Sequence, residues 1–314
     1  MVNKSQQVLE EMNKVIVGKK PVIEKIWMAI LAQGHILLED IPGVGKTTLA
    51  VALSKVLDLD SKRIQFTPDV VASDVVGFTM YDKQSGEFIY KEGAVMCNLL
   101  LGDEINRTSS RTQAALLEAM QEGHVTVDSI TYELPKPFHV IATQNPLGIH
   151  GTQALPQAQL DRFLVKLSIG YPDFESQVAL LRQRQEINPM NEISAVIDKA
   201  ELVELQNHVK MLHMSDEILR YVTALTEETR KSNFLVHGIS PRGALAICNM
   251  AKAHAFVKGS DFVTPEDVIA VFVDTCHHRI ILSAHAKTAQ LSEVEVLMKI
   301  IKQVVTPDTH VYQS

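Results

Sequence analysis

The sequence of 314 residues has few cysteines, and this scarcity excludes a disulfide-stapled extracellular scaffold. Its three cysteines, Cys97, Cys248 and Cys276, lie far apart, form no C-x-x-C pair and stand among apolar neighbours. This pattern is typical of reduced thiols in the core of an intracellular protein. The composition is otherwise globular, with 46% hydrophobic residues, 15 glycines and 12 prolines, so disordered and collagen-like chains are also excluded.

The chain also lacks a block of like charge and a long apolar run. Lys and Arg number 30 against 37 Asp and Glu, a formal net charge of −7, which does not suit a protein that coats a polyanion. Apolar stretches stay well below the roughly 18 residues that a membrane helix needs. Residues 1–11 are polar where a signal peptide would be apolar. We therefore expect a cytoplasmic protein without membrane insertion.

The length lies near the upper limit for one hydrophobic core, which favours two domains. In the first half, short apolar runs typical of strands alternate with segments of helical spacing. The predicted strands are 35–39, 64–66, 96–101 and 139–143, and the predicted helices are 5–16, 21–33, 47–57 and 111–121. Such alternation predicts an α/β fold with a doubly wound parallel sheet.

Two insertions interrupt this alternation, and a helical half follows it. Residues 69–95 contain the turn-like Gln84-Ser85-Gly86-Glu87, and residues 122–138 alternate around Asp128-Ser129 as a β-hairpin does. After Tyr171-Pro172 only helical patterns remain. The helices predicted there are 175–186, 200–212, 216–231, 241–257, 265–273 and 293–303. We therefore predict an α/β domain at 1–172 and a smaller all-helical domain at 173–314.

The strongest functional pattern is the segment Asp40-Ile41-Pro42-Gly43-Val44-Gly45-Lys46-Thr47, between a predicted strand and a predicted helix. Gly43 and Gly45 allow backbone N–H groups to turn inward around an anion at the helix N-terminus. Lys46 would reach the terminal phosphates, and the hydroxyl of Thr47 would hold Mg²⁺. Asp40 stands where the G-x-x-x-x-G-K-[ST] pattern has its first glycine, which leaves the turn geometry open. The alternative is a glycine-rich helix start without a ligand.

A second pattern is the apolar strand Leu99-Leu100-Leu101-Gly102, which ends in Asp103 and Glu104. Adjacent side chains on a strand point to opposite sides, so the two carboxylates can divide their tasks. Asp103 would hold hydrated Mg²⁺ while Glu104 activates the attacking water, and an NTPase needs a carboxylate for each. Such a strand end alone usually marks only a polar turn, but the phosphate loop upstream favours the functional interpretation.

Three further side chains are candidates for the same site. Asn145 follows the apolar strand Val140-Ile141-Ala142-Thr143, at the strand end where ligands of open α/β sheets bind, although Asn before Pro also opens ordinary turns. Arg162 follows the sheet and stands between apolar residues. Arg242 follows the predicted helix start Ser240-Pro241, where a cation opposes the helix dipole unless an anion lies nearby. The alternative for both arginines is an ordinary surface salt bridge.

Together these motifs resemble the MoxR-type AAA+ ATPases, a P-loop NTPase family, over nearly the whole chain. The segments that carry the resemblance are Asp40 to Thr47, Asp103-Glu104-Ile105-Asn106-Arg107, Ala119-Met120-Gln121-Glu122-Gly123, Ala142-Thr143-Gln144-Asn145-Pro146, Gln159-Leu160-Asp161-Arg162-Phe163 and Ser240-Pro241-Arg242. The resemblance implies ATP and Mg²⁺ as ligands, ATP hydrolysis as the activity, and a C-terminal helical lid.

The resemblance also implies a role for each matching residue. Lys46 and Thr47 correspond to Walker A, Asp103 and Glu104 to Walker B, and Asn145 to sensor 1. Arg162 would be the arginine finger offered to a neighbouring subunit, and Arg242 the sensor 2 residue on the lid. The implied nucleotide contacts are Val17, Gly18, Gly43, Val44, Gly45, Lys46, Thr47 and Thr48, and the implied Mg²⁺ ligands are Thr47 and Asp103. Arg107 and Arg111 are further candidates for reaching a neighbour.

The resemblance further implies a homo-oligomeric, hexameric ring whose central face is lined by the 69–95 insert and the 122–138 hairpin. Its partners would be a von Willebrand factor A domain protein and a protein client, for chaperone-like remodelling or maturation of complexes. The alternatives are a helicase-like nucleic-acid motor, a magnesium-chelatase-type motor subunit and a non-hydrolysing nucleotide switch. We favour a protein client because both insertions carry more acids than bases, whereas a pore that grips phosphates should be basic. The intact Glu104 disfavours the switch.

Overall fold

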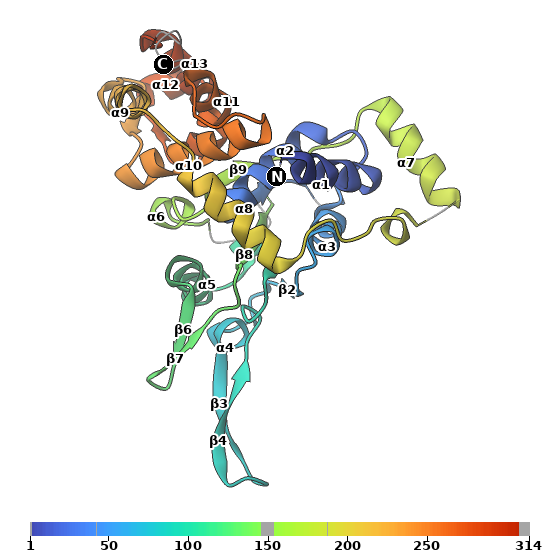
Figure 1. Cartoon of the computed structure of the whole chain (residues 1–314). Coiled ribbons are helices and arrows are strands. Elements are labelled where there is room, and N and C mark those ends of the chain that lie inside the picture. Colours follow the sequence, from blue (N-terminus) through green and yellow to red (C-terminus); the bar gives the residue numbers. More distant parts are fainter. Residues whose placement is uncertain (1, 42, 146–153, 187, 308–314) are drawn as a thin grey trace.

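The computed structural model describes residues 2–41, 43–145, 154–186 and 188–307. Its centre is a five-stranded sheet in the order β2-β5-β8-β1-β9, with all neighbours parallel (Figure 1). The strands are β1 (Ile36–Glu39), β2 (Ser61–Gln65), β5 (Leu99–Asp103), β8 (His139–Gln144) and β9 (Val165–Leu167). The doubly wound sheet predicted from the sequence is therefore confirmed.

The outer strand β9 corrects one part of the prediction. The sequence predicts four strands with Arg162 after the last of them, whereas β9 lies beyond this arginine and pairs with β1. Val165 is opposite Ile36, and Leu167 is opposite Leu38. Three residues are too few to show a periodic signal, so β9 is defined by its partner strand rather than by its own sequence.

Alternating strand residues divide the interior into two apolar cores, one on each face of the sheet. Ile36 and Leu38 belong to one core, and Leu37 belongs to the other, as expected for side chains that alternate along a strand. The first core contains residues of α1 (Val2–Val15), α2 (Lys20–Leu31) and α3 (Lys46–Val56), and the second contains residues of α5 (Ser110–Glu122). Helices α3 and α5 thus cover opposite faces of the sheet (Figure 1).

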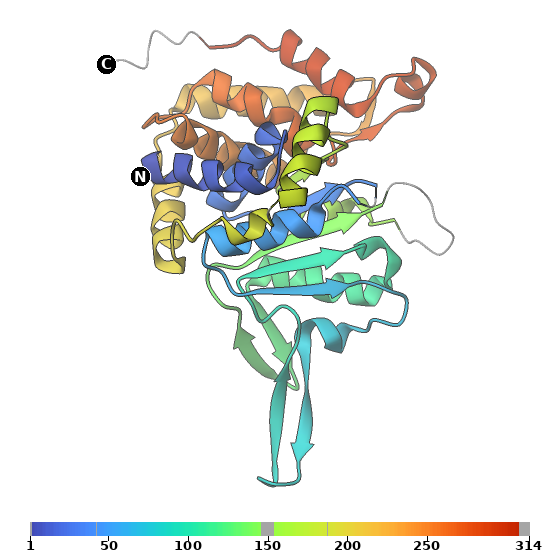
Figure 2. The same cartoon turned by 90° about the vertical axis from the view of Figure 1, so that its right-hand side faces the viewer.

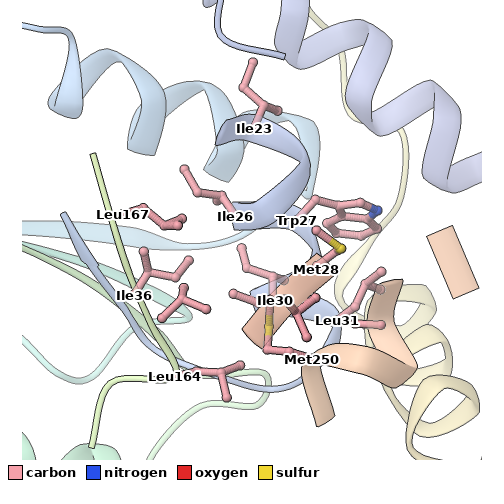
Figure 3. Packing of buried hydrophobic residues seen from close by; sticks show 14 of the residues in the cluster. Ile23, Ile26, Trp27, Met28, Ile30, Leu31, Ile36, Leu164, Leu167 and Met250 are labelled. Carbon is pink, nitrogen blue, oxygen red and sulfur yellow. The ribbon is translucent and has the colours of Figure 1, made fainter. Parts of the chain in front are cut away.

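Helix α2 joins the sheet to the helical half of the chain. Its buried side chains include Ile26, Trp27 and Ile30, which occupy the same core as Ile36 of β1 and Met250 (Figure 3). Trp27 also donates a hydrogen bond from Nε1 to Ser5 Oγ of α1 at 2.6 Å. A helix that is apolar on most of its surface must be covered on most of its surface. The sheet, α1 and the C-terminal helices provide this cover.

Both predicted insertions form antiparallel hairpins that extend away from the sheet (Figures 1 and 2). The first insertion begins with the short helix α4 (Ala72–Val76) and continues as β3 (Gly77–Asp82) and β4 (Glu87–Glu92). The second contains β6 (His124–Val127) and β7 (Ile130–Glu133). Asp128 and Ser129 connect these last two strands with φ of 48° and 67°, the positive angles that a two-residue hairpin turn requires. The rings of Tyr90 and Tyr132 stack between the hairpins, with centroids 3.9 Å apart.

The second half is mainly helical, but it is not all-helical as predicted. It adds a two-stranded antiparallel sheet of β10 (Leu235–His237) and β11 (Ile281–Leu282), whose strands are too short for a periodic pattern. Its helices are α7 (Phe174–Glu186), α8 (Lys199–Met211), α9 (Asp216–Lys231), α10 (Pro241–Val257), α11 (Pro265–Cys276), α12 (Ala284–Thr288) and α13 (Glu293–Gln303), with a short 3₁₀ turn at Pro189–Asn191. The first half also contains a 3₁₀ turn at Ile105–Arg107 and the short helix α6 (Gln157–Leu160) before β9. Within the described residues, every helix is too short or too polar to cross a membrane. The domain boundary near residue 172 stays a prediction.

Candidate active site

The phosphate loop has the backbone that its glycines predict. Gly43 and Gly45 adopt φ of 87° and 94°, and Gly45 is the residue at the N-terminal cap of α3. A Cβ atom built on either glycine would meet no heavy atom within 4 Å. The glycines are therefore needed for the left-handed conformation rather than for space, and the loop opens onto a volume that an anion can enter.

Asp40, the departure from the usual loop pattern, ties the loop to the segment after β9. Its buried carboxylate accepts hydrogen bonds from the hydroxyl of Ser168 at 2.9 Å, the backbone N–H of Ile169 at 2.6 Å and the backbone N–H of Gly170 at 3.0 Å. Its backbone carbonyl accepts a hydrogen bond from Nζ of Lys46 at 2.9 Å. The aspartate thus acts as a structural link and replaces the first glycine without closing the loop.

Replacing Asp40 with alanine is expected to lower the free energy of unfolding by about 2–4 kcal/mol, because one buried and two partly buried hydrogen bonds to a charged acceptor would be lost. Urea unfolding, followed by far-UV circular dichroism, measures the change. Asp60 is a matched control, since its side chain is 80% exposed and forms a surface ion pair with Lys199. Asp60→Ala is expected to cost less than about 1 kcal/mol, and equal losses in both variants would contradict the structural role of Asp40.

Lys46 lies close to three carboxylates. Burial lowers the pKa of Lys46 below its ordinary value, and the negative charges of Asp40, Asp103 and Glu104 oppose this shift. A partly buried ammonium group that faces carboxylates and an open loop is suited to the binding of a charged phosphate.

Asp103 and Glu104 lie at the carboxyl end of β5, each held by an arginine. Asp103 is buried, and its Oδ2 accepts a hydrogen bond from Arg63 Nε at 2.8 Å. Oε2 of Glu104 forms an ion pair with Arg107 at 2.7 Å. The strand ends at Asp103, and Glu104 lies just beyond it with φ of 58°, so the alternation of adjacent strand side chains expected from the sequence does not apply to this pair. Thr143 of β8 connects them, because its hydroxyl donates to Asp103 Oδ1 at 3.3 Å and accepts from the N–H of Glu104 at 3.0 Å.

The phosphate loop and the two carboxylates line one open cavity of about 360 Å³. Its lining residues are Gly43, Gly45, Lys46, Thr47, Thr48, Arg63, Gln65, Asp103, Glu104 and Thr143. The hydroxyl of Thr47 and the carboxylate of Asp103 are hard oxygen donors of the kind that Mg²⁺ prefers, so the donor set fits this ion. Sequence reasoning missed Arg63 and Gln65, which lie on the exposed edge strand β2 and carry no motif of their own.

The described lining of this cavity does not include the remaining candidates Val17, Gly18, Val44 and Asn145. Val44 is partly buried and packs on the first core. Val17 and Gly18 lie between α1 and α2, and a Cβ on Gly18 would come within 2.1 Å of Ser176 Oγ on α7. Asn145 follows β8, and its backbone carbonyl accepts a hydrogen bond from the Asn106 side chain at 3.4 Å. The predicted roles of these residues stay predictions.

The side chains of Arg162 and Arg242 both contact α5, which covers the opposite face of the sheet from α3. Arg162 donates from its guanidinium to the carbonyl of Leu117 at 2.7 Å, and Arg242 donates to Gln121 Oε1 at 3.3 Å. Leu117 and Gln121 are one helical turn apart. The described lining of the nucleotide cavity contains neither arginine. Arg107, by contrast, pairs with Glu104 of the same chain.

Comparisons with known proteins agree with this geometry. Residues 35–165 match the model of the ATPase family associated with various cellular activities (AAA), and residues 227–300 match the model of the AAA lid domain. The uncharacterized protein YeaC of Bacillus subtilis is 43% identical over 299 residues, which cover 95% of this chain and 93% of that protein. Chaperone MoxR1 of Mycobacterium tuberculosis is 35% identical over 318 residues, which cover 98% of this chain and 84% of that protein.

A solved structure shows the same fold. The crystal structure of a proposed ATPase from Cytophaga hutchinsonii matches with a TM-score of 0.91 and 37% sequence identity. The match covers 98% of this chain and 96% of that chain. The strand order and the helical half described above therefore belong to a fold already known from experiment.

Proposed function

The chain belongs to the MoxR family of AAA+ ATPases, and from this premise we propose that it binds and hydrolyses ATP with Mg²⁺ to remodel or mature protein complexes. The observation that carries the proposal is the cavity that joins the glycine loop to Asp103 and Glu104. An open loop at a helix N-terminus, a lysine and two carboxylates are the parts that phosphoryl transfer to water requires.

Each group in the cavity has a separate task in this proposal. Backbone N–H groups from Gly43 to Thr47 and the ammonium group of Lys46 bind the phosphates. Thr47 and Asp103 would hold Mg²⁺, and the bound ion would neutralise charge on the phosphate oxygens. Glu104 accepts a proton from the attacking water. Glu104 is paired with Arg107 in the described structure, so this ion pair must loosen before the carboxylate can act as a base.

Among the described residues of one subunit, the arginines at the phosphate cavity are Arg63 and Arg107, and both already pair with carboxylates. Arg63 pairs with Asp103, and Arg107 pairs with Glu104. No described arginine of the same subunit is left to contact the terminal phosphate. Arg162 lies on another face, where its Nε is buried and has no hydrogen-bond partner among the described atoms. We therefore infer a homo-oligomeric ring, hexameric by resemblance, in which Arg162 and Arg242 act on the nucleotide of the adjacent subunit.

The projecting hairpins support a protein client rather than a nucleic acid. The β3-β4 hairpin exposes Phe78, Met80, Tyr81 and Phe88, with Phe88 74% exposed. Residues 69–95 hold five acids against two lysines. Exposed apolar side chains on an acidic ribbon favour contact with unfolded or partly folded polypeptide and disfavour contact with phosphates. A von Willebrand factor A domain protein is the proposed partner, and the cytoplasm the proposed location.

Replacing Phe88 with serine is expected to leave basal ATP hydrolysis unchanged and to weaken client binding by about 5- to 30-fold, the usual effect of losing an exposed aromatic anchor. Reduced, carboxymethylated α-lactalbumin is a suitable unfolded probe, and stimulation of ATP hydrolysis against its concentration gives the apparent affinity. Met211→Ser is the matched control, because Met211 is an exposed apolar residue at the end of α8. Stimulation by single-stranded DNA, without stimulation by the unfolded protein, would contradict the proposed client class.

A further inference from the structure

An ion pair between a buried arginine and a partly buried aspartate joins the α/β half to the helical half. Arg279, only 3% exposed, donates from Nε to Asp161 Oδ1 at 2.8 Å. The rest of its guanidinium donates to backbone carbonyls, among them those of Phe163 at 2.7 Å and Leu164 at 3.0 Å. The second carboxylate oxygen of Asp161 accepts a hydrogen bond from the Ser240 hydroxyl at 2.9 Å. We call Asp161, Ser240 and Arg279 the Asp161 cluster.

Removing the guanidinium group of Arg279 from water costs free energy, so its N–H groups need hydrogen-bond acceptors nearby. Burial lowers the pKa of Arg279 below its ordinary value, whereas the charge of Asp161 opposes that shift. An apolar pair of similar volume usually stabilises a protein as well as a buried ion pair does. A geometric role would explain why a charged pair occupies this position.

Two members of the cluster, Asp161 and Ser240, lie close in sequence to the two arginines that contact α5. Asp161 directly precedes Arg162, which reaches the Leu117 carbonyl. Ser240 is the N-cap of α10, where its hydroxyl oxygen also accepts a hydrogen bond from the Gly243 N–H at 3.1 Å. Arg242, which reaches Gln121, lies in the first turn of that helix. One carboxylate therefore holds both backbone segments that carry an arginine.

The packing around α10 is also close. A Cβ on Gly243 would come within 3.0 Å of Cδ of Arg279 and within 2.5 Å of Cγ2 of Ile239. The first turn of α10 therefore rests directly on the Arg279 side chain. A shift of Arg279 would move Arg242 through this contact and Arg162 through Asp161.

We propose that Asp161 and Arg279 are positioning residues that hold Arg162 and Arg242 as one unit, so that a subunit presents both arginines together to the nucleotide of its neighbour. The inference rests on the proposed function, because it requires a shared site. Neither positioning residue touches the nucleotide. They instead fix the positions of the guanidinium groups of Arg162 and Arg242. A displacement of about 1 Å in such a group can lower the rate of the catalysed reaction about 100-fold.

The test uses mixed rings. Recipient subunits carry Arg162→Ala and keep an intact Glu104, whereas donor subunits carry Glu104→Gln and keep Arg162. Activity in the mixture then comes from recipient sites that use a donor arginine. Adding Asp161→Asn to the donor is expected to lower the kcat of the mixture at least tenfold, with the KM for ATP unchanged. The donor's own nucleotide affinity should stay the same.

The matched control is Asp267→Asn in the donor. Asp267 forms another buried pair in the helical half, with His254 at 2.7 Å, and is expected to have no effect on the mixture. Arg279→Lys is a second donor variant, which keeps the positive charge but cannot span the same carbonyls, and it should lower kcat by an intermediate amount. In a donor that already lacks Arg162 and Arg242, adding Asp161→Asn should have no further effect.

The outcomes separate the two ideas. If the Glu104→Gln donor without further substitutions restores no activity, the shared site is wrong and the positioning role falls with it. ATP hydrolysis by the unaltered chain tests the proposed function separately. If that donor restores activity and its Asp161→Asn derivative restores it equally well, the proposed function stands and the positioning role is wrong. An equal loss in the Asp267→Asn donor would show a general effect on the helical half, which would also overturn the positioning role.

Discussion

Replacing Arg162 with alanine is expected to reduce the kcat for ATP hydrolysis by about 10³- to 10⁵-fold, the range that a trans-acting arginine contributes in phosphoryl transfer. The affinity for ATP should change little, because the described lining of the nucleotide cavity does not include Arg162. Arg162 instead extends along α5 and has a buried Nε without a partner in the described part of the chain. Steady-state hydrolysis and equilibrium binding of a fluorescent ATP analogue measure the two quantities separately.

Arg182 provides the control for this substitution. It is an exposed arginine on α7, and Arg182→Ala should leave both quantities unchanged. Mixing Arg162→Ala subunits with Glu104→Gln subunits should restore activity that neither variant has alone. An Arg162→Ala protein that hydrolyses ATP as fast as the unaltered chain would remove the idea of a shared site.

Replacing Glu104 with glutamine is expected to lower kcat by about 10²- to 10⁴-fold, the usual contribution of a general base. Glutamine keeps the size of the side chain but cannot accept the proton of the attacking water. ATP binding should persist, because the phosphate loop and Asp103 remain intact. Single-turnover hydrolysis with pre-bound ATP isolates this step from product release.

Glu118→Gln is the control for charge alone, since Glu118 lies on α5 beside Arg162 rather than in the nucleotide cavity. Unchanged single-turnover hydrolysis in the Glu104→Gln protein would show that another group activates the water. Loss of ATP binding in that protein would show instead that Glu104 belongs to the binding set. Either result would remove the assignment of Glu104 as the base.

The sequence predicts those parts of the fold that depend on local patterns. The four longer strands of the sheet, the boundaries of α9, α10 and α13, and the positive φ angles of Gly43 and Gly45 all follow from periodicity or from turn chemistry. The meeting of the phosphate loop with Asp103 and Glu104 also follows, because parallel strands end at one edge of the sheet.

The features that were missed depend on tertiary contacts. β9, β10 and β11 have three residues or fewer, so only their partners define them as strands. The role of Asp40 requires donors at Ser168, Ile169 and Gly170, more than a hundred positions along the chain. The pairing of Asp161 with Arg279 spans a similar separation and leaves no local trace in the sequence. Sequence patterns report neighbours along the chain, whereas these interactions join distant segments.

The link made by Asp40 has a mechanical consequence. The carboxylate that anchors the start of the phosphate loop also fixes residues 168–170, from which the chain runs into the helical half. Any rearrangement of the loop on filling or emptying must either carry this junction along or break three hydrogen bonds at once. A loop that moved on binding would therefore act directly on the segment that leads into the C-terminal helices, through the side chain of Asp40 alone.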